Sequence, residues 1–248
     1  LDSAVLVGAD AVVALNGAGI GDARWTDDRK AILRSSRIDS VGLLASAIAL
    51  MECPPGVFVS ASATGFYGDT GDDLVDEGAP PGGDFLATLC VDWEAAARPA
   101  ASSQTRVVRA RTGIVLARNG GALEPLLPLF KVGLGGPIAS GRQWWSWITL
   151  ADEVSALLFL IDSDISGPVN LVAPNPVRQV DFAKALGVQL RRPAVIPVPR
   201  FALNLRLGKE LAEAIGIASQ RVSPRTLLDS GFQFGSSEID EALASVLG

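Results

Sequence analysis

The 248-residue sequence contains no histidine. Imidazole is the usual general base of Ser-His-Asp and Cys-His sites, and it is the commonest ligand of transition metals in proteins. Its absence makes the common hydrolases and zinc enzymes poor candidates. We therefore expect no metal site.

Cysteine and tyrosine are also scarce. The two cysteines, Cys53 and Cys90, have no CxxC spacing, and we interpret both as small, reduced, buried hydrophobic residues of a cytosolic protein. Tyr67 is the only tyrosine, and it lies in the segment SASATGFYGDTG beside serine and threonine residues.

Long apolar runs are missing, and no basic region precedes an apolar stretch, so we expect a soluble, cytoplasmic protein without a membrane partner. The net charge is −6, and lysine and arginine are scattered along the chain. This distribution disfavours nucleic acid as a partner and favours a small molecule.

Strand-like and helix-like segments alternate in the first half of the chain. Apolar, β-branched runs predict strands at 10–16, 56–62 and 105–117, and helical periodicity predicts helices at 26–51 and 85–101. Strands separated by helices form right-handed βαβ units, so we predict an α/β fold with a doubly wound parallel sheet.

The second half is less regular. It predicts a proline-interrupted helix at 122–134 and further helices at 151–163 and 179–187. It also predicts strands at 144–150, 167–173 and 193–199. We expect residues 1–118 to form a partial dinucleotide-binding, Rossmann-like region. Residues 119–248 would form the substrate side, a small C-terminal α/β cap, with the strands near 144–150 and 167–173 partly returning to the core.

A glycine motif follows the first predicted strand. LNGAGIGD contains Gly17, Gly19 and Gly21, but the dinucleotide fingerprint GxGxxG requires its third glycine at position 22, which is Asp22. A carboxylate there would repel a pyrophosphate. A glycine turn that contacts a cofactor and a purely structural turn therefore both remain open.

Arginine and tryptophan cluster in two places. Arg142 lies near Trp144, Trp145 and Trp147, and a guanidinium with an indole suits a phosphate and a flat ring. Strand alternation places Trp145 and Trp147 on one face, and core tryptophans with an exposed arginine are the alternative. Arg24 and Trp25 form a second pair, for which substrate contact and loop packing remain equally open.

Several segments together resemble one known family. They are ADAVVALNGAGIGDARWTDDRKAILRSSRI, SASATGFYGDTG, DFLATLCVDWE, RTGIVLARNGGAL, GLGGPIASGRQWWSWITLADE, GPVNLVAPNPV, RRPAVIPVP and RTLLDSGFQF. In their order and spacing they resemble the atypical extended short-chain dehydrogenase/reductases, the nucleoside-diphosphate-sugar epimerase-like proteins sometimes labelled cell-division inhibitors. This resemblance implies a Rossmann-like fold and a nicotinamide cofactor, NADP more often than NAD.

The family begins with strands and a glycine-rich phosphate loop that would precede the segment starting at Leu1. We expect these N-terminal strands to be missing from the sequence, so that an additional N-terminal segment or domain would supply them. Carried over by the resemblance, the expected cofactor-binding residues are Asn16, Gly17, Ala18, Gly19, Ser60, Ala61, Arg111, Thr112 and Gly113.

The family's usual proton-transfer pair is a tyrosine followed four residues later by a lysine. Gly71 stands four residues after Tyr67, and the helix positions that match the pair are Leu86 and Cys90, which cannot perform this chemistry. The resemblance leaves Ser62 and Tyr67 as the candidate catalytic residues. Ser62 could instead cap a loop, and Tyr67 could contact substrate, transfer a proton or only pack.

The expected substrate-binding residues are Arg24, Trp25, Thr64, Arg142, Trp145 and Trp147. We expect an NAD(P)-dependent epimerase- or oxidoreductase-like enzyme that acts on a nucleotide-sugar-like or small carbonyl substrate without the usual dyad. The alternative is a catalytically silent NADP-binding sensor or interaction protein, because a fold alone does not determine function.

Overall fold

A computed structural model describes residues 3–248 and is built around a parallel four-stranded sheet. Its strands are β1 (Ala11–Ala14), β2 (Val57–Ala63), β4 (Arg106–Thr112) and β8 (Gly167–Leu171), in the order β1-β2-β4-β8. The register places Ser62 opposite Arg111 and Arg111 opposite Asn170. All four strands therefore end at the same edge of the sheet.

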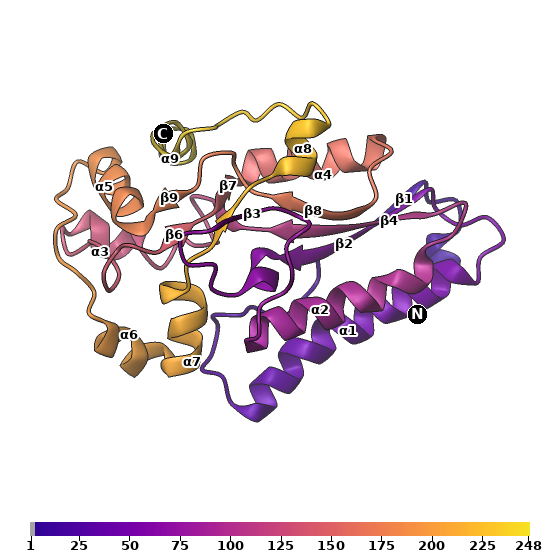
Figure 1. The fold of residues 1–248 in the computed structure, drawn as a ribbon, viewed down its shortest axis with the longest axis horizontal. Coiled ribbons are helices and arrows are strands. Elements are labelled where there is room, and N and C mark those ends of the chain that lie inside the picture. Colours follow the sequence, from indigo (N-terminus) through magenta and orange to yellow (C-terminus); the bar gives the residue numbers. More distant parts are fainter. Residues whose placement is uncertain (1–2) are drawn as a thin grey trace.

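Helices cover both faces of this sheet (Figure 1). Helices α1 (Asp27–Ala49) and α2 (Phe85–Ala97) lie on one face, and α4 (Leu150–Asp162) and α8 (Arg225–Asp229) lie on the other. Thr26, Asp84 and Thr149 cap the first three of these helices, because each side chain accepts a hydrogen bond from a backbone N–H of the first turn. The predicted doubly wound α/β fold is confirmed.

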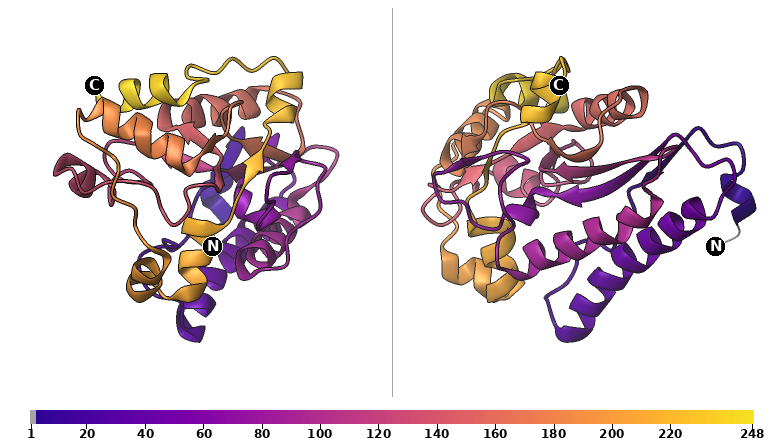
Figure 2. Two further views of the ribbon diagram at one scale, coloured as in Figure 1. Left: turned by 60° about the vertical axis from the view of Figure 1, so that its left-hand side comes forward. Right: turned by 45° about the vertical axis from the view of Figure 1, so that its right-hand side comes forward.

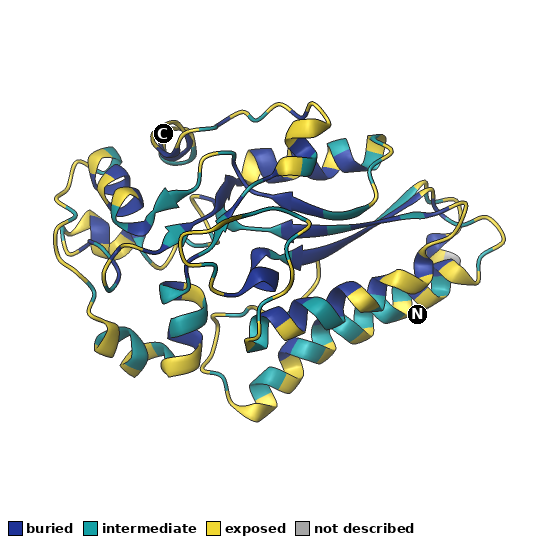
Figure 3. Ribbon diagram, viewed as in Figure 1, coloured by how far each residue is buried: buried dark blue, intermediate teal, exposed yellow. Residues whose placement is uncertain are grey.

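The helix faces that meet the sheet are the buried ones (Figure 3). Helix α1 buries Leu33, Arg37, Val41, Ala45 and Ile48, one residue in each turn. Arg37 is the single charged residue in this otherwise apolar stripe. Within residues 3–248, no helix combines the length and the apolar character needed to cross a membrane.

Three two-stranded sheets stand beyond the carboxyl edge of the main sheet. They pair β5 (Ile114–Leu116) with β7 (Trp147–Thr149), β6 (Trp144–Trp145) with β9 (Val177–Arg178), and β3 (Leu74–Val75) with β10 (Arg221–Val222). The predicted strand 105–117 is therefore two strands that separate at Gly113. A Cβ atom at Gly113 would lie 2.6 Å from the Ser146 carbonyl oxygen and from Val172 Cγ1, so only glycine fits this close crossing.

The predicted strand 144–150 is also two strands, in different sheets, and Leu150 already belongs to α4. The predicted helix 122–134 shortens to α3 (Leu127–Lys131). The predicted strand 193–199 was wrong, because Val198 forms only a single bridge with Ile138. Prolines at 193, 197 and 199 cannot donate the hydrogen bonds that a strand would need.

The remaining helices are α5 (Gln179–Gln189), α6 (Arg200–Leu207), α7 (Lys209–Ala212) and α9 (Ile239–Leu247). A π-helical turn follows α7 at Glu213–Ile217, and 3₁₀ turns occur at Ser3–Leu6, Thr64–Tyr67 and Arg98–Ala100. Figure 2 shows α5, α6 and α7 gathered at the end of the sheet where β2 and β4 finish. These three helices, within residues 179–212 and here called the cap, lie over the carboxyl edge of the sheet.

The two cysteines differ in environment. Cys90 is buried in α2, as expected, whereas Cys53 is exposed. The prediction for Cys53 was wrong because this residue lies in the bend between α1 and β2, outside the core.

Candidate functional site

A crevice of about 240 Å³ opens at the carboxyl ends of β2 and β4. The segments that follow these strands, 63–65 and 112–114, line it, and Trp144, Trp145 and Ser146 close it from the cap side. Ligands of open α/β sheets bind at such strand ends. Thr64, Thr112 and Gly113, three of the expected site residues, lie here together.

Helix α2 presents its crevice-facing side with Leu86, Leu89, Cys90 and Trp93. Leu86 and Cys90, which match the family's tyrosine and lysine positions, therefore face the crevice. Burial, together with the nearby Glu94 carboxylate, raises the pKa of the Cys90 thiol to about 12. Cys90 is therefore a neutral thiol at physiological pH and a poor nucleophile.

Arg37 of α1 also lines the crevice and is only 8% exposed. Its Nη1 atom donates to the Leu33 carbonyl of its own helix at 3.2 Å, and its guanidinium lies 5.1 Å from the centroid of the Trp93 ring. Among residues 3–248 no carboxylate lies within ion-pair distance of Arg37. Burial lowers the pKa of Arg37, yet arginine stays charged at neutral pH, so this cation lacks an anionic partner.

Trp93, the neighbour of Arg37, adds a hydrogen-bond donor that has no acceptor among the described residues. Its side chain lines the crevice, and its indole N–H is buried without an acceptor in the described part of the chain. Buried donors of native proteins are normally paired. Among the described residues, a buried cation without a counter-ion thus lies next to an indole N–H without an acceptor, and together they mark a place for an anionic or acceptor-rich ligand.

The loop after β1 packs against α1 beside Arg37. Asn16 Nδ2 donates to the Ser36 carbonyl at 2.8 Å, and the Ala18 N–H donates to Ser36 Oγ at 3.1 Å. A Cβ atom at Gly17 would lie 2.8 Å from Arg37 Cζ. Glycine at this position therefore lets the loop approach the guanidinium.

The same loop continues to Gly19, where a Cβ atom would lie 2.3 Å from the Asp22 carboxylate. Asn16, Gly17, Ala18 and Gly19 thus form one anchored turn next to the crevice. Arg29 of α1 also donates a hydrogen bond from Nη2 to the Gly19 carbonyl.

Ser62, Tyr67 and Arg111 belong to a buried network with Glu94 and Asn170. Ser62 Oγ donates to Glu94 Oε1 at 2.9 Å, and Arg111 binds both Glu94 carboxylate oxygens, at 2.7 and 3.0 Å. Arg111 Nη1 donates to the Tyr67 hydroxyl at 2.9 Å, and this hydroxyl donates to Asn170 Oδ1 at 2.7 Å. The structure thus joins both candidate catalytic residues and one expected cofactor residue to each other, and none of the three lines the crevice.

Burial raises the pKa of Tyr67, although Arg111 opposes this effect. The phenol is 5% exposed and therefore neutral at physiological pH. Its hydroxyl uses its single proton within the protein, so proton transfer to a ligand would require the network to break.

Two other expected cofactor residues lie within β2. Ser60 and Ala61 are buried in the strand, and Ser60 Oγ donates a hydrogen bond to the neighbouring Ala61 carbonyl at 3.3 Å. Neither lines the crevice. Thr112 does, and its hydroxyl donates to Glu153 Oε1 at 2.8 Å.

Glu153 of α4 carries no signal in the sequence that would mark it as a site residue. Burial raises its pKa to about 7, while the hydrogen bond from Thr112 opposes this rise. Its second oxygen is buried and receives no hydrogen bond from the part of the chain that the structure describes. The Glu153 carboxyl group, whose pKa is close to neutral pH, is therefore hydrogen-bonded to the last residue of β4.

The Arg142–Trp147 segment is divided by the fold. Trp145 lines the crevice, Trp147 is fully buried with its indole bonded to the Asn175 carbonyl at 3.1 Å, and Arg142 is exposed and lines no described cavity. Trp144, on the other face, also lines the crevice. It stacks against Arg178 and Arg221, whose guanidinium carbons lie 4.1 and 4.5 Å from its ring centroid.

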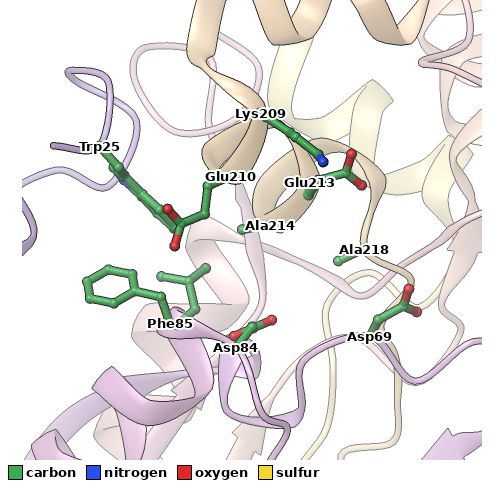
Figure 4. A pocket seen from close by; sticks show the side chains of 10 residues that line it. Trp25, Asp69, Asp84, Phe85, Lys209, Glu210, Glu213, Ala214 and Ala218 are labelled. Atoms are coloured by element: carbon green, nitrogen blue, oxygen red, sulfur yellow. The ribbon is translucent and has the colours of Figure 1, made fainter.

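Arg24 and Trp25 lie in the loop before α1 and contact the cap. Arg24 Nε donates to the Arg206 carbonyl at 3.2 Å. Trp25 packs edge-on against Phe85 at 5.0 Å and lines a separate surface pocket of about 400 Å³ (Figure 4). The charged residues that line this surface pocket are Asp69, Asp84, Lys209, Glu210 and Glu213, so carboxylates predominate.

A larger cavity of about 650 Å³, here called the apolar cavity, lies between α3, α6 and β5. It shares Ile114, Trp145 and Ile215 with the crevice, so the two are adjacent. Arg206 is the only charged residue in its lining. Within the described 246 residues, no group of three or more histidine, cysteine, aspartate or glutamate residues could hold a metal ion.

A parallel sheet covered on both faces, with a crevice at its strand ends beneath a cap, defines a Rossmann-like α/β protein. Comparisons with known proteins narrow this class. The chain is 44% identical over 244 residues to epimerase family protein ML0860 of Mycobacterium leprae, covering 98% of this chain and 78% of that protein. Residues 198–246 match a family described as a domain of unknown function, DUF1731.

Solved structures of epimerase family proteins are also similar to this chain. The chain resembles the human epimerase family protein SDR39U1, isoform 2, crystallised with NADPH, with a TM-score of 0.94, 34% identity, and coverage of 97% of this chain and 82% of that chain. It also resembles a nucleoside-diphosphate sugar epimerase of Corynebacterium glutamicum, with a TM-score of 0.77, 36% identity, and coverage of 99% and 48%. The chain belongs to the epimerase family that includes SDR39U1.

Proposed function

We propose that this protein binds a nicotinamide dinucleotide in the crevice, NADP in preference to NAD, and acts as an oxidoreductase or epimerase-like enzyme on a small carbonyl compound or alcohol. The observation that carries the proposal is Arg37, a buried cation at the carboxyl edge of a parallel sheet for which residues 3–248 supply no counter-ion. The NADPH bound to the human relative supports this choice of cofactor and of its phosphorylated form.

The residues around Arg37 fit such a ligand. Arg37 and the Trp93 indole N–H would donate to its anionic or acceptor groups, and the backbone at Gly17 and Gly113 allows close approach. The cofactor, when bound, supplies hydride transfer. Its apolar surroundings, Leu86, Leu89 and Trp145, would exclude water from that step.

A second candidate function is a sensor that binds the cofactor without turnover. It is favoured because Leu86 and Cys90 face the crevice where a proton-transfer pair would stand. The hydroxyls of Ser62 and Tyr67 are also engaged within the protein. For the enzyme, the proton would come from solvent after the hydride has been transferred.

The test is fluorescence titration of the full-length protein with NADPH and NADH. We expect Arg37→Met to weaken NADPH binding at least tenfold and Arg37→Lys to weaken it less, because lysine retains the charge. Arg34→Met is the matched control, since Arg34 is on the same helix and pairs with Asp92 at its surface. Binding of neither nucleotide would refute both functions.

Turnover separates the two candidates. The NADPH-loaded protein is mixed with small aldehydes and ketones, and the absorbance of the reduced nicotinamide is followed. Oxidation that depends on the carbonyl compound supports the enzyme. Binding without oxidation by any of these compounds supports the sensor.

A further inference from the structure

The apolar cavity is large enough for a small-molecule ligand and nearly free of charge. Its volume of about 650 Å³ lies within the usual range for ligand sites. Its walls include Leu126, Leu129 and Phe130 of the α3 region and Leu203 of α6. Such walls favour hydrocarbon and offer little to a polar ligand.

The cavity is adjacent to the reaction site. Ile114, Trp145 and Ile215 line both the cavity and the crevice, so a molecule in the cavity can extend one end to the crevice. Trp145 is 6% exposed and is fixed against Phe182, with ring centroids 5.0 Å apart. The wall that the two spaces share is therefore apolar.

A nucleotide sugar is poorly matched to these surroundings. Its diphosphate carries two negative charges and is normally held by arginine or lysine side chains. The apolar cavity provides only Arg206, which is exposed, and the surface pocket near Trp25 sets Lys209 among four carboxylates. Arg142 lines neither space.

We infer that the substrate is a largely apolar molecule whose hydrocarbon part occupies the apolar cavity and whose reacting oxygen reaches the crevice. This inference rests on the proposed function, because it takes the crevice as the place of the nicotinamide. Nucleotide sugars are then excluded as substrates, because the cavity offers their diphosphate too little positive charge. Arg206, in the lining of the cavity, would bind a polar or acidic group of such a ligand.

The experiment is calorimetric titration of the full-length protein loaded with NADP⁺, which cannot reduce a ketone, with 2-alkanones from six to ten carbons and with UDP-glucose. Burial of each added methylene should strengthen 2-alkanone binding by roughly fourfold. UDP-glucose should not bind. Tighter binding of UDP-glucose than of 2-decanone, or 2-alkanone affinity independent of length, would overturn the inference.

Two variants locate the binding. Leu129 lines the apolar cavity and is 41% exposed, so Leu129→Asp should weaken 2-decanone binding at least tenfold without unfolding the protein. Val132 is the control, because it is 68% exposed on the same segment and lies outside the cavity lining. Equal effects of Leu129→Asp and Val132→Asp would contradict the assignment.

Two further measurements distinguish loss of substrate binding from loss of cofactor binding and from association between copies of the chain. NADPH affinity is measured in both variants and should equal that of the wild type, so that the failure of this inference differs from the failure of the proposed function. Sedimentation velocity is run on all three proteins. If Leu129→Asp changes the number of chains in the sedimenting particle and leaves 2-decanone affinity unchanged, the cavity is a contact between copies of the chain. The inference then fails.

Discussion

The Tyr67 hydroxyl donates a hydrogen bond of 2.7 Å to Asn170 Oδ1, which joins the only tyrosine of the chain to the edge strand β8 of the central sheet. The same hydroxyl accepts from Arg111. Tyr67 is thereby tied to two strands and to the ion pair between Arg111 and Glu94. Its surroundings are those of a structural residue.

We therefore expect Tyr67→Phe to act on stability. Removal of the hydroxyl leaves Asn170 Oδ1 without its donor and costs Arg111 one acceptor, which should lower the free energy of unfolding by about 1–3 kcal/mol. Denaturant unfolding measures this change. Thr88→Ala, which removes an exposed hydroxyl, should change it by less than about 0.5 kcal/mol. A loss of kcat/KM beyond tenfold in Tyr67→Phe with unchanged stability would instead assign Tyr67 to the reaction.

Gly113 and Gly42 should respond in opposite ways to alanine. A Cβ atom at Gly113 would collide with backbone and with Val172, so Gly113→Ala should destabilise the protein by about 1–3 kcal/mol or more. Gly42 lies inside α1 with nothing within 4 Å of an added Cβ, so Gly42→Ala should stabilise it by about 0.5–1 kcal/mol. Thermal and urea unfolding of the two variants provides the comparison. Two changes of the same sign would refute this account.

Glu153 should make stability depend on pH. Its pKa of about 7 in the folded protein lies above its ordinary value of 4.5, so between these values the folded state holds a proton that the unfolded state has released. The free energy of unfolding should therefore fall as pH rises from about 4.5 through 7, by up to about 3 kcal/mol from this group. The loss is complete above the folded pKa.

Glu153→Gln should remove this contribution. The amide oxygen can accept the Thr112 hydrogen bond, and the side chain has no proton to release. The variant should be more stable than the wild type at pH 8, with the advantage shrinking toward pH 4.5. Urea unfolding at a series of pH values tests this, and Glu241→Gln, at an exposed position of α9, provides the background slope. Parallel pH profiles of Glu153→Gln and wild type would contradict the expectation.

The two cysteines should differ in their reaction with iodoacetamide. Cys53 is exposed, whereas Cys90 is buried and its thiol has a pKa of about 12. Mass spectrometry of the native protein at pH 8 should show one modified cysteine, Cys53, and unfolding in urea should expose the second. Native modification of Cys90 would mean that α2 opens away from the sheet.

Much of the sheet and helix pattern follows from local signals. Apolar β-branched runs indicated β1, β2, β4 and β8, and the capping residues Thr26, Asp84 and Thr149 mark the starts of their helices. The breaks in longer predicted strands do not follow from such signals. Gly113 interrupts a β-branched run because Ser146 and Val172, distant in sequence, cross it closely.

The site was only partly accessible to sequence reasoning. Arg37 carried a readable signal, since it lies four residues from Leu33 and four from Val41 on a helix face that is otherwise apolar. The network of Ser62, Glu94 and Arg111 carried none, because it joins three separate elements through side-chain geometry. Whether a polar side chain at a strand end turns toward the crevice or toward the neighbouring helix is decided by such partners.

One wall of the crevice comes from residues 214–220, and these residues are bound to a segment about 150 positions earlier in the sequence. Thr64 Oγ1 donates to Gln220 Oε1 across 156 positions of sequence, and the Thr70 N–H donates to the Ser219 carbonyl. Contacts this distant form late, because the loop between them must close first. During synthesis on the ribosome, the crevice is therefore completed only after Gln220 has emerged, long after β2 and β4 have done so.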